Sequence, residues 1–230
     1  MSPDYVALIP ARGGSRGIPR KNLEIVGDLS LLERAIKAGR DCSRISGCYV
    51  SSDDKEILEA AVEAGAVGHL RPSKAAADNA RATEVVKDFV KNCSGFEASS
   101  IVVYLQPTSP FRTGQHIDEA IRLFEESGAK SLVSVVKTSH LPEKTVHVSD
   151  SGIIGLGSPA GDPGANRQDL EPVYSPNGAI YIFDVEQFEK YGDVPVGGAQ
   201  AFIMGKVDSL DIDDLDDLIL ARGVAAIANI

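Results

Sequence analysis

The sequence predicts an α/β protein in which helices flank a mainly parallel β-sheet. Apolar strand-like runs alternate with amphipathic helical segments through the first 137 residues, as in strands joined by crossover helices. Two of the runs, residues 101–107 and 131–136, are apolar over nearly their whole length, which is typical of central parallel strands. A glycine-rich loop directly follows the first strand, where open α/β sheets place their ligands.

The first half of the chain shows two such strand–helix pairs. Residues 5–10 (YVALIP) read as the first strand, and a helix is expected from about Leu31 to Cys42, with Ser30 as its N-cap. Residues 48–52 (CYVSS) form the second strand. The strongly helical segment 55–65 follows it and is stopped by a glycine.

The remaining elements continue the alternation. Residues 66–70 form a short strand, and segment 82–92 has apolar residues at helical spacing. The central strand 101–107 leads into a crossover helix at 116–128, which returns to the buried strand 131–136. Residues 179–184 (AIYIFD) rejoin the sheet, and an acidic stretch precedes a terminal helix.

Residues 138–176, which we call the arm, differ in texture from the rest. They are rich in Gly, Pro, Ser and Asp and contain only short strand-like pieces. An excursion of this length within a compact domain is usually functional. The 230 residues fit one domain, 1–230, with the arm inside it.

Charge and composition restrict the function classes. The formal net charge is -10, so the overall field repels nucleic acid and anionic lipid surfaces. Three cysteines without Cys-x-x-Cys spacing fit a reducing compartment. We see neither a signal peptide nor an apolar run long enough to span a membrane. We therefore expect a cytoplasmic protein that binds neither nucleic acid nor membranes.

The glycine loop, residues 11–22 (ARGGSRGIPRKN), concentrates positive charge in this acidic chain. Backbone N–H groups around Gly13, Gly14 and Ser15 can form a concave anion site. Arg12, Arg16 and Lys21 add charge that suits a polyphosphate, whereas Arg20 has no predicted partner. The spacing matches neither the Walker pattern nor the dinucleotide fingerprint. The competing interpretation is an ordinary structural turn.

The acidic segment, residues 207–218 (VDSLDIDDLDDL), is the second candidate site. In an extended chain Asp211 and Asp213 point the same way, so one Mg²⁺ ion can take a ligand from each, together with substrate phosphates. The competing interpretation of the segment is an acidic helix N-terminus, which explains Asp214, Asp216 and Asp217 well but does not explain Asp211. Gln106 and Arg71, each at a strand end, are weaker candidates. The four histidines show no metal-ligand spacing.

Six stretches in order resemble the CMP-sialic acid synthetases, the cytidylyltransferases of nine-carbon 2-keto-3-deoxy sugar acids. They are IPARGGSRGIPRKN, SSDDKEI, LRPSKAAADNARAT, LQPTSPFRTGQHIDEAI, NRQDLEPVYSPNGAIYI and DIDDLDDLILA. The resemblance covers nearly the whole chain. It implies a three-layer, Rossmann-like nucleotidyltransferase fold and a transfer of CMP from CTP to the sugar acid, with release of pyrophosphate.

The resemblance also implies roles by motif position. Arg12, Lys21 and Asp211 would be catalytic, and Asp211 with Asp213 would hold Mg²⁺ or Mn²⁺. The nucleotide would be bound by Arg12, Gly13, Gly14, Ser15, Arg16, Lys21, Asn22 and Arg71. The sugar acid would be bound by Gln106, Lys144, Arg167, Asn177 and Tyr181. The arm would mediate a homodimer.

Several alternatives stay open. The acceptor is N-acetylneuraminate, a legionaminic or pseudaminic relative, or another 2-keto-3-deoxy sugar acid. Whether Asp211 removes the proton of the attacking hydroxyl is also open. From a different class, the chain could be a non-catalytic nucleotide-binding protein that has kept the fold. The presence of Arg12, Lys21, Asp211 and Asp213 together argues for the enzyme.

Overall fold

The computed structural model describes residues 4–14, 17–72, 82–94, 96, 100–138, 141–157, 161–162, 164, 166–191 and 197–230, without the side chains of Arg167, Gln187 and Tyr191. Within these residues seven strands form one sheet in the order β11-β7-β10-β6-β1-β4-β5. The strands are β1 (Tyr5–Pro10), β4 (Ile45–Ser52), β5 (Val67–Leu70), β6 (Ile101–Tyr104), β7 (Ser131–Lys137), β10 (Tyr174–Asp184) and β11 (Gln200–Met204). The helices are α1 (Leu31–Asp41), α2 (Lys55–Glu63), α3 (Ala82–Asn92), α4 (Gly114–Ser127), α5 (Val185–Tyr191) and α6 (Leu215–Ala228).

The sheet is mainly parallel, as predicted. β1 pairs in parallel with both β4 and β6, and β4 pairs in parallel with β5. β10 is the exception, because it runs antiparallel between β6 and β7. Four strands therefore have their carboxyl ends on the same side of the sheet, namely β1, β4, β5 and β6. The glycine loop, which follows β1, lies on this side.

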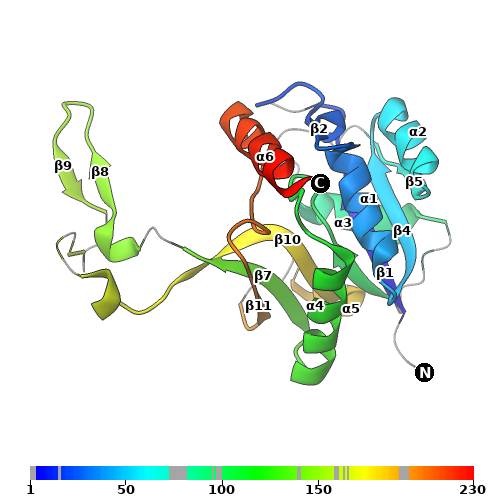
Figure 1. Cartoon of the computed structure of the whole chain (residues 1–230). Helices are drawn as coiled ribbons and strands as arrows, with labels where there is room; N and C mark the ends of the chain where they lie inside the picture. The colour runs from blue at the N-terminus through cyan, green and yellow to red at the C-terminus, as the bar shows by residue number, and fades with distance from the viewer. Residues whose placement is uncertain are drawn as a thin grey trace.

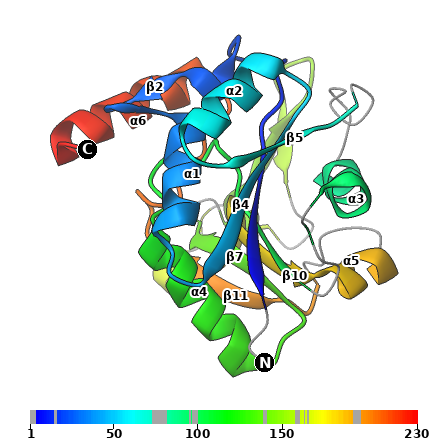
Figure 2. The same ribbon diagram turned by 90° about the vertical axis from the view of Figure 1, so that its right-hand side faces the viewer.

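Two apolar cores place helices on opposite faces of the sheet, which gives three layers (Figure 2). On one face, Leu32 of α1 and Ile117 of α4 belong to the cluster that includes Ile9 of β1, and α2 also packs there. On the other face, Phe89 of α3 and Phe188 of α5 pack with strand residues. The predicted α/β class is confirmed.

Polar caps fix where the helices begin. Ser30 caps α1 in a capping box with Glu33, and Asp54 accepts backbone N–H bonds at the start of α2. Asp214 caps α6 in a capping box with Asp217. Such caps satisfy backbone donors that a helix leaves open at its first turn. The predicted N-cap at Ser30 is confirmed, and the helix-terminus interpretation of Asp214 and Asp217 is correct.

A third apolar cluster lies beneath α6. Ile18 of the glycine loop and Ile212 of the acidic segment both belong to it, together with Phe111, Leu31 and Leu218. Ile212 has no exposed surface, and Ile18 is 5% exposed. This cluster therefore holds two loops that are almost 200 residues apart in sequence against each other.

The arm leaves the body of the molecule beside β7 and β10 (Figure 1). It carries a hairpin of β8 (Val146–Val148) and β9 (Ile154–Leu156), and the 3-10 helices η3 (Pro142–Lys144) and η4 (Arg167–Asp169). A smaller hairpin, β2 (Ile25–Val26) with β3 (Leu29–Ser30), follows the 3-10 helix η1 (Lys21–Leu23) of the glycine loop.

The structure adds elements that the sequence analysis did not predict. These are α5 and β11, both between residues 185 and 204, and the hairpin of β2 and β3. β10 is longer than the predicted strand at 179–184. Its register with β7 shifts between Pro176 and Tyr181, where Gly178 has a φ of +75°. This irregular stretch lies beside the candidate site.

Candidate active site

The glycine loop begins under restraint from the end of β4. The Ala11 N–H donates to the Ser51 carbonyl at 2.9 Å, and the Gly13 N–H donates to Asp53 Oδ1 at 3.1 Å. A Cβ atom at Gly13 would lie 2.6 Å from Asp54 Oδ2, so glycine is required for this close approach. Gly14, in contrast, faces open space. Ser15 and Arg16 lie outside the described residues.

Two polar residues of the loop bind other parts of the protein. Asn22 is 5% exposed, and its Nδ2 donates to the Arg12 carbonyl at 2.9 Å, so it fixes the loop backbone. Arg20 adopts a left-handed conformation with a φ of 54°. Its guanidinium forms an ion pair of 2.7 Å with Glu56 and lies 3.9 Å from Asp54. Arg20, for which the sequence predicted no partner, thus ties the loop to α2.

Lys21 joins the glycine loop to the acidic segment. Its Nζ donates to the Ile212 carbonyl at 2.7 Å and lies 3.7 Å from Asp213 Oδ1. A Cβ atom at Gly17 would lie 2.6 Å from the Asp213 carbonyl oxygen. The structure therefore places the predicted phosphate loop and the predicted carboxylate pair in direct contact.

Asp211 is a partly buried carboxylate with unused bonding capacity. Its Oδ1 is buried and has no hydrogen-bond partner among the described residues. Burial raises the pKa of Asp211, and the nearby Asp213 carboxylate adds to the rise, while a hydrogen bond from Thr108 and the charge of Lys21 oppose it. A buried carboxylate oxygen without a donor is suited to a cation.

Asp213 differs from Asp211 in exposure, since 83% of its side chain is accessible. The described residues contain no group of three or more His, Cys, Asp or Glu side chains placed to hold a metal ion. Two carboxylates are nonetheless a usual protein contribution to a Mg²⁺ site, because substrate phosphates and water supply the other ligands. The residues present therefore fit the predicted ion.

Arg71, just after β5, is a buried cation. It is 4% exposed, and its Nε and Nη1 atoms have no hydrogen-bond partner in the described parts of the chain. Burial lowers the pKa of Arg71. The charge of Arg12 adds to this effect, while Tyr104, Asp53 and Asp88 oppose it. The guanidinium groups of Arg12, after β1, and Arg71, after β5, thus repel each other although β4 separates their strands, as in a site built for an anion.

Part of the predicted sugar-acid site also comes together. A Cβ atom at Gly178 would lie 2.3 Å from Gln106 Oε1 and 3.5 Å from Asp211 Oδ2, so these two side chains meet at this glycine. Burial raises the pKa of the Tyr181 hydroxyl, and the Asp211 carboxylate adds to the rise. Gln106 and Asp211 therefore meet at Gly178, and Tyr181 lies within electrostatic range of Asp211.

Asn177 precedes Gly178, but its side-chain amide binds other protein groups rather than facing the site. It is 5% exposed, and its Oδ1 accepts from Ser134 Oγ at 2.5 Å. Its Nδ2 donates to Ser209 Oγ at 2.8 Å and to Met204 Sδ at 3.4 Å. These bonds hold β10 to β7 and to the start of the acidic segment, so the Asn177 amide supports the backbone at Gly178.

Lys144 and Arg167 are not brought to this group within one chain. Lys144 ends η3 and Arg167 begins η4, and both 3-10 helices belong to the arm, which extends away from the sheet (Figure 1). The side chain of Arg167 lies outside the described residues. For these two residues to reach the site of their own chain, the arm would have to fold back against the sheet.

The structure adds residues that sequence reasoning missed. The Asp53 carboxylate accepts from the Gly13 N–H of the glycine loop, and the Thr108 side chain hydrogen-bonds Asp211. The Arg112 guanidinium donates to the Gln106 carbonyl. The carboxylates after β4 carried a signal, because they follow a strand that ends at the ligand-binding edge. No sequence signal indicated that Arg112 is buried, because an arginine that follows a Pro-rich turn is normally expected at the surface.

The sequence profile of the cytidylyltransferase family matches residues 6–151. An N-acylneuraminate cytidylyltransferase of Streptococcus agalactiae is 32% identical over 220 residues, which is 95% of this chain and 52% of that protein. The chain thus spans about half the length of this relative. A CMP-N,N'-diacetyllegionaminic acid synthase of Legionella pneumophila is 31% identical over 90% of both chains.

Two solved structures share the fold. A CMP-2-keto-3-deoxy-manno-octonic acid synthetase complexed with CTP has a TM-score of 0.73 at 15% identity, over 98% of this chain and 99% of the other. A 4-diphosphocytidyl-2C-methyl-D-erythritol synthase of Anaerococcus prevotii has a TM-score of 0.65 at 14% identity, over 97% and 99%. No helix in the described ranges is long and apolar enough to cross a lipid bilayer.

Proposed function

The chain belongs to the cytidylyltransferase family, in its CMP-sialic acid synthetase group, and from this premise we propose that it transfers CMP from CTP to the anomeric 2-hydroxyl of a nine-carbon sugar acid, releasing pyrophosphate. The observation that carries the proposal is the contact between the glycine loop and the acidic segment. Lys21 bonds the backbone between Asp211 and Asp213, so cations for a triphosphate and carboxylates for its metal ion lie together.

The nucleotide half of the reaction falls to the glycine loop and Arg71. Lys21 and Arg12 bind the phosphates and offset the negative charge that develops on the departing pyrophosphate. Open space at Gly14 lets phosphate oxygens approach the backbone. Because the transfer needs little covalent work from the protein, orientation of the two substrates carries much of the rate.

Asp211 and Asp213 would hold Mg²⁺ or Mn²⁺. When bound, such an ion polarises a phosphoryl oxygen and neutralises charge on the triphosphate. Lys21 keeps the carboxylate-bearing backbone in place, through its bond to the Ile212 carbonyl. Thr108 restrains the same segment, because its carbonyl accepts from the Ile212 N–H at 2.9 Å.

The acceptor half would lie at Gln106, Tyr181 and Gly178. Amide and phenol groups there can bind the hydroxyl and acetamido groups of a nonulosonic acid. Two acceptor classes deserve equal testing. An N-acylneuraminate is named for a relative that is about twice as long as this chain. Diacetyllegionaminic acid is named for a relative of similar length, which matches over 90% of both chains.

The test is pyrophosphate release from CTP and Mg²⁺ with a panel of acids. The panel contains N-acetylneuraminic, diacetyllegionaminic and pseudaminic acids and an eight-carbon 2-keto-3-deoxy acid. We expect release that requires both CTP and a nine-carbon acid, with the CMP-sugar as co-product. Absence of release with every acid, while CTP still binds, would favour the non-catalytic nucleotide-binding protein.

We also propose that two copies of the chain associate through the arm. The β8–β9 hairpin exposes large apolar side chains. Val146, Val148, Ile154 and Leu156 share one of its faces, because Val146 pairs with Leu156 and Val148 with Ile154, and Ile153 directly precedes β9. These five side chains are 46–69% exposed. An apolar hairpin that projects into solvent is typical of an interface. Association would also bring Lys144 and Arg167 of one copy toward a second copy.

Ile154→Asp should convert a dimer to a monomer. Val148 pairs with Ile154 across the hairpin, so a charge there disrupts the centre of the apolar surface. Light scattering after size exclusion at micromolar concentration measures the mass. Val62→Asp is the matched control, because Val62 is 60% exposed on α2, away from the arm. A monomeric wild type, or an Ile154→Asp dimer of unchanged affinity, contradicts the proposal.

A further inference from the structure

Arg112 is a buried cation that binds two backbone carbonyls beside the candidate active site. It is 3% exposed, and its Nη1 donates to the Gln106 carbonyl at 2.9 Å and to the Ala179 carbonyl at 3.0 Å. Gln106 lies two residues after the end of β6, and Ala179 follows Gly178 in β10. One guanidinium nitrogen therefore connects the two chain segments whose residues meet at Gly178.

The same residue closes the loop of residues 106–112. Thr108, within that loop, accepts the Ile212 N–H through its carbonyl at 2.9 Å and bonds the Asp211 side chain. Arg112 ends the loop and returns its guanidinium to the carbonyl where the loop began. The position of Gln106 and the support of Asp211 thus depend on one closed segment.

The other nitrogen atoms of the Arg112 guanidinium lack hydrogen bonds that would offset the cost of burying its charge. Its Nε and Nη2 atoms have no hydrogen-bond partner in the described part of the chain. Burial lowers the pKa of Arg112 to about 10, and the group that opposes this is the Cys48 thiol rather than a carboxylate. The side chain is still charged at neutral pH. A buried charge without a counter-ion is expensive for a fold, and such groups concentrate at functional sites.

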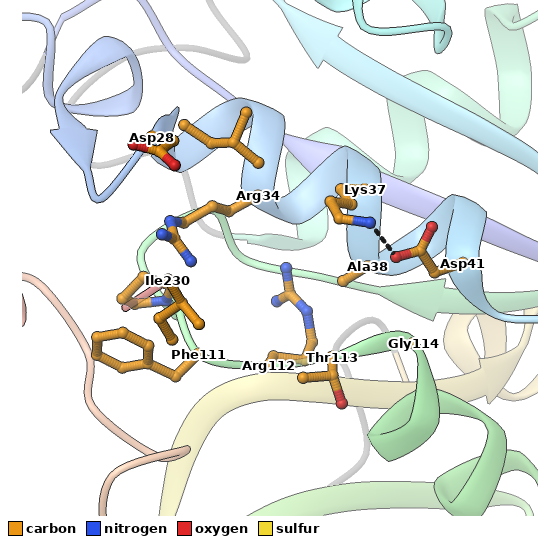
Figure 3. A pocket seen from close by; sticks show the side chains of 12 residues that line it. Asp28, Arg34, Lys37, Ala38, Asp41, Phe111, Arg112, Thr113, Gly114 and Ile230 are labelled. Atoms are coloured by element: carbon orange, nitrogen blue, oxygen red, sulfur yellow. Dashed lines mark hydrogen bonds and ion pairs between the residues drawn. The ribbon is translucent and has the colours of Figure 1, made fainter. Parts of the chain in front are cut away.

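The Arg112 side chain also lines a pocket. It has a volume of about 330 Å³ and is bordered by α1, by residues 110–114 and by Ile230. Figure 3 shows the Arg112 side chain pointing from its loop toward α1, near Ala38. Lys37 reaches the same pocket and is paired with Asp41. A small solute that enters the pocket would therefore come close to the Arg112 side chain.

We propose that Arg112 is a positioning residue for the sugar-acid half of the reaction, which rests on the proposed function. Its guanidinium sets the separation of Gln106 and Gly178 and, through the 106–112 loop, the support of Asp211. It touches neither substrate. The start of the glycine loop and Arg71 would contact the nucleotide from the ends of β1 and β5, and the two hydrogen bonds of Arg112 go to neither of them.

Arg112→Met and Arg112→Ala test this role by separating the two substrates. In both variants we expect the KM for the sugar acid to rise at least 10-fold and kcat to fall at least 10-fold. The dissociation constant for CTP, measured by calorimetry without divalent ions so that the metal site at Asp211 does not contribute, should change less than 3-fold. Lys37→Met is the matched control, because it removes a cation from the same pocket without touching the two carbonyls, and its kinetics should equal those of the wild type.

Rescue supplies the second readout. Arg112→Ala leaves a space that adjoins the pocket, so added guanidinium or ethylguanidinium should restore sugar-acid turnover at least 5-fold, and methylammonium should restore less. Arg112→Lys should be intermediate, since an ammonium group donates to both carbonyls without the planar geometry. A purely structural role would raise both substrate constants together and would show no rescue.

The outcomes are distinguishable from failure of the proposed function. An inactive wild type contradicts the proposed reaction itself. An active wild type, together with folded Arg112→Met protein whose sugar-acid KM and kcat are unchanged, overturns the positioning role. If Arg112→Met fails to fold, unchanged sugar-acid KM and kcat in folded Arg112→Lys protein overturn it instead.

Discussion

Asp211→Asn should sharply reduce turnover while making the ligand-free protein more stable. The substitution removes the charge that would bind the metal ion, and we expect kcat to fall by about 10³-fold, the size of effect seen when a preorganised electrostatic group is lost. The same carboxylate destabilises the ligand-free protein, because its Oδ1 is buried without a hydrogen-bond donor among the described residues. An amide of equal size removes the charge, and the free energy of unfolding should rise by about 1 kcal/mol.

The pH dependence of this stability difference follows from the direction of the pKa shift. The pKa of Asp211 is raised in the folded protein, chiefly by burial. The folded state therefore binds the proton more tightly than the unfolded state does. Its stabilising contribution is complete below the unfolded pKa of about 4 and is lost as pH rises through the higher folded pKa. The advantage of Asp211→Asn should thus be largest at neutral pH and shrink toward pH 4.

Thermal and urea unfolding in the presence of a chelator measure this difference, and pyrophosphate release measures turnover. Asp216→Asn is the matched control, since Asp216 is exposed in the first turn of α6 and lies outside the carboxylate pair. It should keep wild-type turnover. Near-normal activity in Asp211→Asn would move the metal site elsewhere, and a loss of stability without metal would contradict the account of a buried, unpaired charge.

The sequence was sufficient for the parallel half of the fold because each strand and helix there carries its own local signal. YVALIP alone identifies β1, and Ser30 marks the start of α1. β11 (Gln200–Met204) was missed because its apolar run, AFIM, is only four residues long, and as an edge strand it stays partly exposed. The antiparallel direction of β10 was also invisible, since apolar content does not encode strand direction.

The candidate site shows the same division between local and tertiary information. Strand-end position predicted Arg71 and Gln106, the charge of the glycine loop predicted Lys21, and the spacing to Asp213 predicted Asp211. The structure brings Lys21 to the acidic segment. Sequence could not show that Asn22 bonds the Arg12 carbonyl, because a polar residue in a loop reads alike whether it faces a ligand or its own backbone. Such partners are settled only by packing.

Arg71→Met should weaken CTP binding by about 100-fold and leave the fold intact. Charge-assisted hydrogen bonds to an anion contribute about 1.5–3 kcal/mol, and about 2.7 kcal/mol corresponds to that factor. The fold should tolerate the change because Nε and Nη1 of Arg71 have no partner in the described parts of the chain, and methionine fills a similar apolar volume. The backbone bond from the Arg71 N–H to the Ser52 carbonyl, at 2.9 Å, is unaffected.

Calorimetry with CTP and with cytidine locates the contact. If Arg71 binds phosphate, the loss should be confined to CTP and should shrink as salt concentration rises, because screening weakens the lost charge interaction. If it binds the base or ribose, cytidine should lose affinity as well. Arg122→Met is the matched control, since Arg122 is exposed on α4 and pairs only loosely with Glu126 at 4.0 Å. Unchanged CTP affinity in folded Arg71→Met protein would remove Arg71 from the nucleotide site. Its buried Nε and Nη1 atoms, which have no partner among the residues that the structure describes, would then require another ligand.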